Sequence, residues 1–221
     1  MQADTFSGSG GTVRPAKPKL RGWLHAAMFP VAVAVGIVLI VIAPTLPSRI
    51  ASVIFTVTAA LLFGTSAVYH RGTWSGRVAV WMRRWDHSNI FLIIAGTYTP
   101  VALLLLPTGS AEILLTIIWS AAAAGIAFRI FWVGAPRWLY VPVYVGMAVA
   151  GIGYLPAFFR ASPAAGALLL AGGACYVLGA IVYGFKRPDP APRYFGFHEV
   201  FHSLTIAGFL TQYAGILVAA V

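Results

Sequence analysis

The sequence predicts an all-α, polytopic membrane protein: a seven-transmembrane helix bundle with its N-terminus in the cytoplasm and its C-terminus outside. The chain has 221 residues, of which 60% are hydrophobic and only 9% charged, whereas soluble domains carry about 25% charged residues. Its apolar residues fall into seven runs, each near the ~20 residues that a helix needs to cross a bilayer. Its basic residues gather on one side of the resulting topology, which sets the orientation.

The chain divides into a tail and a membrane domain. Residues 1–21 are rich in Gly, Ser, Thr, Pro and basic residues, a composition typical of a disordered, solvated segment. We expect no signal peptide here, because the apolar run that follows is long enough to span and has no clear small-residue cleavage site. We therefore assign residues 1–21 to a disordered basic cytoplasmic tail and residues 22–221 to the seven-helix transmembrane domain.

Helix-breaking or polar residues separate the seven predicted spans. Pro44 and Pro47 follow the first span, a polar and basic loop over residues 70–85 follows the second, and Pro107 follows the third. Gly134-Ala135-Pro136 closes the fourth, Arg160 to Pro163 closes the fifth, and a loop with three prolines at 186–194 follows the sixth. In chain order, the spans are 23–43, 50–69, 87–106, 113–132, 138–158, 164–183 and 197–221.

The distribution of basic residues orients these spans. Of the 15 Lys and Arg residues, all except Arg49 and Arg160 lie in the N-terminal tail or in the second–third, fourth–fifth and sixth–seventh connections. Positively charged connections stay in the cytoplasm. The net charge of +10 therefore reflects membrane orientation and contact with anionic lipid head groups, and we expect no nucleic-acid partner.

Polar residues gather at the predicted cytoplasmic level. The chain holds only five His and five Asp or Glu residues, and ionisable groups in or beside a span are costly and suggest a functional site. The alternating topology brings three short clusters to the same side of the membrane. They are Ser66 with His70 at the end of the second span, Asp86 with His87 at the start of the third, and His198 with His202 at the start of the seventh.

The spacing of His198 and His202 is compatible with metal binding but does not by itself decide for it. Residues four apart share one helix face, where two imidazoles can hold one ion. The string from His198 to His202 also matches the H-E-x-x-H pattern of zinc proteases, but no His, Asp, Glu or Cys follows His202 to serve as a third ligand. His70, on the same membrane level, would complete a three-nitrogen zinc site with the open fourth position that catalysis requires.

Asp86 and Ser66 are the candidate catalytic residues beside this site. Asp86 would orient a ligand or hold a metal-bound water molecule. Ser66 lies one turn deeper than His70 and would hydrogen-bond that water or a substrate carbonyl. Glu199 remains an alternative general base, although it is not required if Asp86 serves.

Each of these residues also has a structural interpretation. Asp86 would cap the third helix or pair with a neighbouring arginine, and Ser66 would bond its own helix backbone. His70 and His87 would be interfacial residues whose polar ends reach water, and Glu199 would interact with a helix N-terminus. The presence of His70 and Asp86 on the level of the histidine pair makes metal binding the better hypothesis for the group. Taken singly, the residues for which we favour a structural role are Ser66, His87, Glu199 and His25.

These residues together resemble the hemolysin III family, the bacterial branch of the progestin and adipoQ receptor superfamily. The resemblance covers roughly residues 17–221. Its motifs are Lys19-Leu20-Arg21-Gly22-Trp23-Leu24-His25, Ser66-x-x-x-His70, Asp86-His87, Ile94-Ala95-Gly96-Thr97-Tyr98-Thr99-Pro100 and His198-Glu199-x-Phe201-His202.

The resemblance implies a seven-helix fold with a cytoplasmic N-terminus in the bacterial inner membrane. It implies a zinc ion held by His70, His198 and His202, with Asp86 and Ser66 as the family's acid and serine near the zinc-bound water. It also relates the chain to the alkaline ceramidases, which share S-x-x-x-H, D and H-x-x-x-H and hydrolyse lipid amides.

Three functions remain open from the sequence. The first is a zinc-dependent hydrolase of a lipid amide or ester, with membrane lipids as the substrate class. The second is a non-enzymatic receptor-like or membrane-homeostasis protein with structural zinc, for which Asp86 would be the fourth ligand. The third is cytolysis by pore formation, which is disfavoured because few polar residues besides those at 97–99 occur in mid-membrane.

Overall fold

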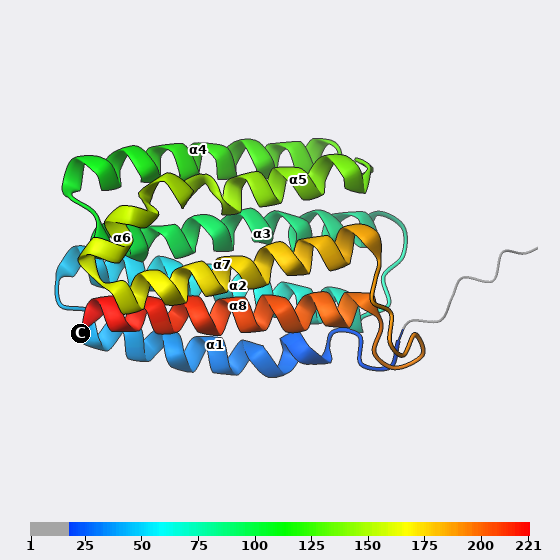
Figure 1. The fold of residues 1–221 in the computed structure, drawn as a ribbon. Helices are drawn as coiled ribbons and strands as arrows, with labels where there is room; N and C mark the ends of the chain where they lie inside the picture. The colour runs from blue at the N-terminus through cyan, green and yellow to red at the C-terminus, as the bar shows by residue number, and fades with distance from the viewer. Residues whose placement is uncertain (1–17) are drawn as a thin grey trace, which may run out of the picture.

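The computed structural model describes residues 18–221 and forms one elongated bundle of roughly parallel helices (Figure 1). Residues 1–17 of the expected tail lie outside the described part. Within the described end of that tail, the Lys19 and Leu20 amides donate to the Arg193 and Tyr194 carbonyls in the loop before the last helix. The helices are α1 Trp23–Ile42, α2 Leu46–Arg71, α3 Gly76–Leu105, α4 Thr108–Phe131, α5 Arg137–Ala148, the 3-10 helix η1 Ala150–Tyr154, α6 Leu155–Ala161, α7 Pro163–Phe185 and α8 Phe197–Ala220.

Within residues 18–221, seven helical segments are long and apolar enough to cross a membrane, which confirms the predicted fold class. The fifth segment, Arg137–Ala161, combines α5, η1 and α6. Helices α3 and α2 have the most buried apolar windows, at 67% and 56%, against no more than 28% for the others. These two helices therefore form the interior of the bundle, where they carry Ser66, His70, Asp86 and His87.

Helix α3 begins earlier than hydropathy predicts. The sequence places residues 70–85 in a loop, but α3 starts at Gly76 after the N-cap residue Ser75. The segment between Gly76 and Asp86 contains no proline or further glycine, so nothing ends the helix where the apolar run ends. Asp86 thus lies inside a helix, and its interpretation as the N-cap is wrong.

Helix α2 also starts before its apolar run. A capping box joins Thr45 and Ser48, whose backbone and side-chain groups exchange hydrogen bonds of 3.0 and 3.3 Å. Pro47 occupies the first turn, where its missing N–H is tolerated. The predicted turn between the first two spans is therefore shorter than expected.

The fifth span is broken where η1 separates α5 from α6. The Tyr98 hydroxyl of α3 donates to the Ala148 carbonyl at 2.7 Å and accepts from the Gly151 amide at 3.0 Å. These bonds satisfy the Ala148 carbonyl and the Gly151 amide, which lie at the break in the helix. A tyrosine side chain from a neighbouring helix thus stabilises the bend.

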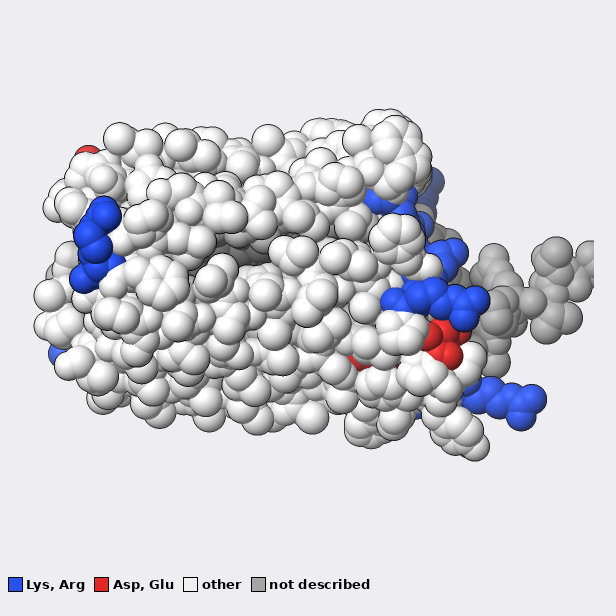
Figure 2. Space-filling view, in the orientation of Figure 1, with Lys and Arg blue, Asp and Glu red and all other residues white. Residues whose placement is uncertain are grey.

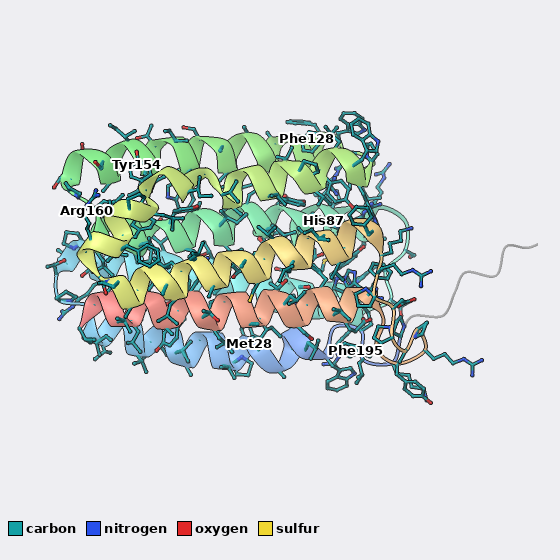
Figure 3. All side chains as sticks on the ribbon, in the orientation of Figure 1. Met28, His87, Phe128, Tyr154, Arg160 and Phe195 are labelled. Atoms are coloured by element: carbon teal, nitrogen blue, oxygen red, sulfur yellow. The ribbon has the colours of Figure 1, made fainter. Side chains whose placement is uncertain are left out.

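The basic residues lie mostly at one end of the bundle (Figure 2). This is the end where the N-terminal segment enters in Figure 1, whereas Arg160 is at the opposite end in Figure 3. Among the described residues, the basic ones close to a helix terminus at this end of the bundle are Arg71, Arg77, Arg129, Arg137 and Lys186. The charge asymmetry counted along the chain is therefore present in three dimensions.

We expect Gly96→Ala to destabilise the contact between α2 and α3. A Cβ atom at Gly96 would lie 2.9 Å from Thr58 Cβ and 3.1 Å from Thr58 Cγ2, and an overpacked core typically costs about 1–3 kcal/mol. Gly173→Ala is the matched control, because a Cβ there meets nothing within 4 Å. Chemical unfolding in detergent micelles measures the difference, and equal stabilities of the two variants would contradict this packing.

Candidate metal centre

Three histidines from two distant helices meet at the end of the bundle where the N-terminal segment enters. His70 lies in the last turn of α2, and His198 and His202 lie in the first two turns of α8. One ring nitrogen from each falls within 4.8 Å of the others, and the His70 and His198 Nε2 atoms are 3.2 Å apart. The structure therefore brings together the three residues that the sequence singled out as ligands.

This nitrogen set could hold a metal ion, and one of its separations can be compared with zinc geometry. Zinc binds histidine nitrogen at about 2.0–2.1 Å, so two tetrahedral ligands lie about 3.3 Å from each other, close to the observed separation of His70 and His198. Neutral imidazole is the form that binds zinc, and His202 is buried with 3% of its surface exposed. The three histidine nitrogens could therefore hold a metal ion.

The first turn of α8 is held by two carboxylates. Glu199 Oε2 accepts from the Gly196 amide at 2.9 Å, and Asp189 Oδ1 accepts from the Phe197 amide at 2.8 Å. The other oxygen of Glu199 pairs with the Arg21 guanidinium. Because both oxygens of the buried Glu199 are engaged, its carboxylate serves the fold of α8 as the structural interpretation expected.

Asp86 lies beside the histidine cluster without joining it. Its Oδ2 atom is 3.7 Å from His70 Nε2 and 3.8 Å from His87 Nδ1. Asp86 is not part of the ligand set whose atoms all lie within 4.8 Å of one another. Ser66, buried on α2, faces the Asp86 carboxyl group. The two candidate catalytic residues are thus adjacent to each other and to the possible metal ligands.

His87 is not part of the ligand set, although it borders the same cavity as the clustered histidines. Its Nδ1 atom is 2.8 Å from the Arg83 carbonyl oxygen, and its ring packs edge-on against Tyr140. His87 is buried, with 9% of its surface exposed, so its interpretation as an interfacial residue whose polar end reaches water is wrong. Figure 3 shows His87 on α3, within the bundle.

Sequence reasoning left His25 out of the site, although it lies against one of the ligands. The His25 and His202 rings are stacked, with centroids 3.8 Å apart and planes 5° from parallel. Neither ring nitrogen of His25 has a hydrogen-bond partner among the described residues. His25 follows the basic N-terminal segment at the start of the first span, so the same topology that grouped the other histidines would have placed it there.

The cluster opens into a largely apolar interior. A cavity of about 110 Å³ borders His25, the three clustered histidines, Asp86 and Ser66. A second cavity of about 250 Å³ lies next to it at the break in the fifth span. The residues that line both are Ile93, Ile94, Ala148, Tyr176 and Val177.

Two tyrosines form the wall of the first cavity on α5 and α7. The hydroxyl groups of Tyr140 and Tyr183 are 3.2 Å apart, and both residues line the cavity. The Arg129 guanidinium lies 4.5 Å from the Tyr140 ring centre, and that of Arg137 lies 4.7 Å from the Tyr183 ring centre. Cation–π contact therefore holds these rings in place.

Comparisons with known proteins match most of the chain to one family model. A family model described as "Haemolysin-III related" matches residues 13–213. A "Hemolysin-3 homolog" of Bacillus subtilis (strain 168) is 32% identical over 167 residues, which cover 74% of each chain. A "Hemolysin-3" of Bacillus cereus is 38% identical over 103 residues, which cover 46% of this chain and 47% of that protein.

Proposed function

This chain belongs to the haemolysin-III-related family and is a multi-pass membrane protein, and from this premise we propose that it is a zinc-dependent hydrolase of a lipid amide or ester. The observation that carries the proposal is the meeting of three histidine nitrogens with Asp86 and Ser66 at one apolar cavity. A zinc-dependent hydrolase that acts on lipids needs this combination of a metal ligand set, a proton acceptor and an apolar chamber.

His70, His198 and His202 would hold the ion. Bound zinc supplies a Lewis acid that polarises a carbonyl group and activates water at neutral pH. Asp86, 3.7 Å from His70 Nε2, would hold the proton that hydrolysis releases. Ser66 would donate a hydrogen bond that orients Asp86 or the substrate carbonyl.

The apolar lining supports a lipid as the substrate. Hydrocarbon surface favours an apolar environment over water by about 25 cal/mol per Å². The second cavity, which shares lining residues with the cavity at the histidines, offers such an environment. Residues of α5 and α7 line both cavities, and Figure 2 shows the surface hollowed between these helices. An acyl chain would enter there from the membrane, with its amide or ester group at the cluster.

The basic end of the bundle supports a cytoplasmic position for this site. By the positive-inside rule, that end faces the cytoplasm, so the N-terminus would be cytoplasmic and the C-terminus outside. The relatives from Bacillus species support a bacterial inner, or plasma, membrane location. The substrate would then come from the cytoplasmic leaflet.

The test is fatty-acid release by the purified, full-length protein in lipid nanodiscs. We expect release from an N-acyl or O-acyl lipid that stops when a chelator removes zinc and returns when zinc is restored. A panel of ceramides and phospholipids distinguishes amide from ester substrates. A zinc-loaded protein that releases fatty acid from none of them would overturn the proposal.

One observation favours a second candidate, a receptor-like or membrane-homeostasis protein with structural zinc. An ion bound by His70 and His198 would tie the end of α2 to the start of α8, as structural zinc does. This alternative requires a fourth protein ligand, and Asp86 is the nearest described carboxylate. Cytolysis by a pore gains no support, because Thr97 and Thr99 donate to carbonyls of their own helix at 2.8 Å.

A further inference from the structure

We propose that residues 18–22, here called the N-terminal strap, position the histidine cluster by holding the end of α2 against the start of α8. Arg21 and Gly22 are the positioning residues. The inference rests on the proposed metal site and adds the part of the chain that sets its geometry.

The strap is attached to the loop that leads into α8. The Lys19 amide donates to the Arg193 carbonyl at 3.1 Å, and the Leu20 amide donates to the Tyr194 carbonyl at 3.2 Å. The Lys19 ammonium group also lies 4.9 Å from the centre of the Tyr194 ring. These contacts place Arg21 beside the first turn of α8.

Arg21 then reaches the residue that lies between the two α8 histidines. Its Nε atom donates to Glu199 Oε1, while Glu199 Oε2 accepts from the Gly196 amide. Only 1% of the Glu199 side chain is exposed, and a buried charge that loses its partner is strongly destabilising. The Arg21 guanidinium therefore stabilises the turn that carries His198 and His202.

The next residue packs against the third histidine. Gly22 has φ of +80°, a left-handed conformation that glycine adopts without steric cost. A Cβ atom at Gly22 would lie 3.0 Å from His70 Cβ and 2.9 Å from Arg71 Cγ. The strap backbone thus lies directly on the end of α2.

Trp23 completes this contact, because the Arg71 guanidinium lies 3.9 Å from the centre of its ring. Two consecutive strap residues, Arg21 and Gly22, therefore contact the two helices that supply all three possible ligands. Since those helices are far apart in the chain, the strap is well placed to set the distance between His70 and the α8 pair.

The first test is the zinc dissociation constant of full-length Arg21→Met in nanodiscs, measured by competition with a chelator. Loss of a partner that orients metal ligands typically weakens metal affinity by about 10- to 100-fold, and we expect a loss in that range. Arg21→Lys should recover most of the affinity because it restores a cation beside Glu199. Arg193→Met is the matched control, because it removes a basic, exposed side chain at the same end and retains the carbonyl that Lys19 uses.

The second test compares two glycines with positive φ. Gly22→Ala and Gly76→Ala both force alanine into the left-handed region, at φ of +80° and +51°. A Cβ at Gly76 meets nothing within 4 Å, whereas one at Gly22 meets His70. We expect weakened zinc binding in Gly22→Ala alone. Equal affinities in these two variants, or an unchanged affinity in Arg21→Met, would overturn the role of the strap.

A readout without metal separates this inference from the proposed function. Amide hydrogen exchange of residues 197–202 in metal-free protein should be faster in Arg21→Met than in wild type or Arg193→Met, because α8 loses its tether. Wild type that binds no zinc would reject the metal site, while faster exchange in Arg21→Met would still support the strap. Unchanged exchange in that variant would reject the strap whatever the metal content.

Discussion

Replacing His202 with alanine is expected to eliminate stoichiometric zinc binding. Wild type should hold about one zinc per chain, as three-histidine sites do, because three ring nitrogens lie within 4.8 Å of one another. Removing His202 leaves only two of them, on different helices. His198→Ala should have the same effect, since it leaves the same number of nitrogens. Mass spectrometric metal analysis of purified protein measures the stoichiometry.

His87→Ala is the matched control for this experiment. His87 is also a buried histidine at the same end of the bundle, but its Nδ1 atom lies against the Arg83 carbonyl oxygen. It should retain zinc at the wild-type level. His202→Gln, which keeps more of the side-chain volume beside His25, separates loss of a ligand from loss of packing. Wild type without zinc, or retention of zinc in His202→Ala or His198→Ala, would refute the metal site.

Changing Asp86 to asparagine is expected to eliminate most of the hydrolysis while leaving zinc bound. Asparagine has nearly the same shape as aspartate but cannot accept the proton, and loss of a general base typically costs on the order of 10²- to 10⁴-fold in rate. Asp86 lies outside the set of clustered nitrogens, so the metal content should remain. Fatty-acid release and zinc content are measured on the same preparation.

The control here is Glu112→Gln, which neutralises an exposed acid on α4. It should change neither quantity. Loss of zinc together with activity in Asp86→Asn would make Asp86 a ligand and favour structural zinc. Turnover at the wild-type rate in Asp86→Asn would show that another group accepts the proton.

Much of the fold follows from local properties of the sequence. Runs of about 20 apolar residues predict spans because an unpaired backbone group in lipid costs several kcal/mol, so each crossing must be helical. All seven predicted spans are present as helical segments. The predicted start of α3 was about ten residues too late. Hydropathy marks where the apolar run begins, whereas the helix itself begins at Gly76.

The candidate ligands were predictable for a related reason. The four-residue spacing of His198 and His202 places them on one face of any helix. The distribution of basic residues predicts that His70 and Asp86 lie at the same membrane level as this pair. The role of Glu199 at the N-terminus of α8 was predictable from its position, but its pairing with Arg21 was not. Its partners are Arg21, far away in the sequence, and the Gly196 amide.

The sequence by itself predicted the number of spans, their orientation in the membrane and the end of the bundle at which the ionisable residues gather. Only the tertiary structure decided which of those residues touch. The stack of His25 on His202, the position of Asp86 beside His70 and the strap across α2 and α8 all depend on how each helix is rotated and tilted against its neighbours. Side-chain packing between helices sets those rotations, and hydrophobic periodicity along one segment does not identify the side chains that its buried face will meet.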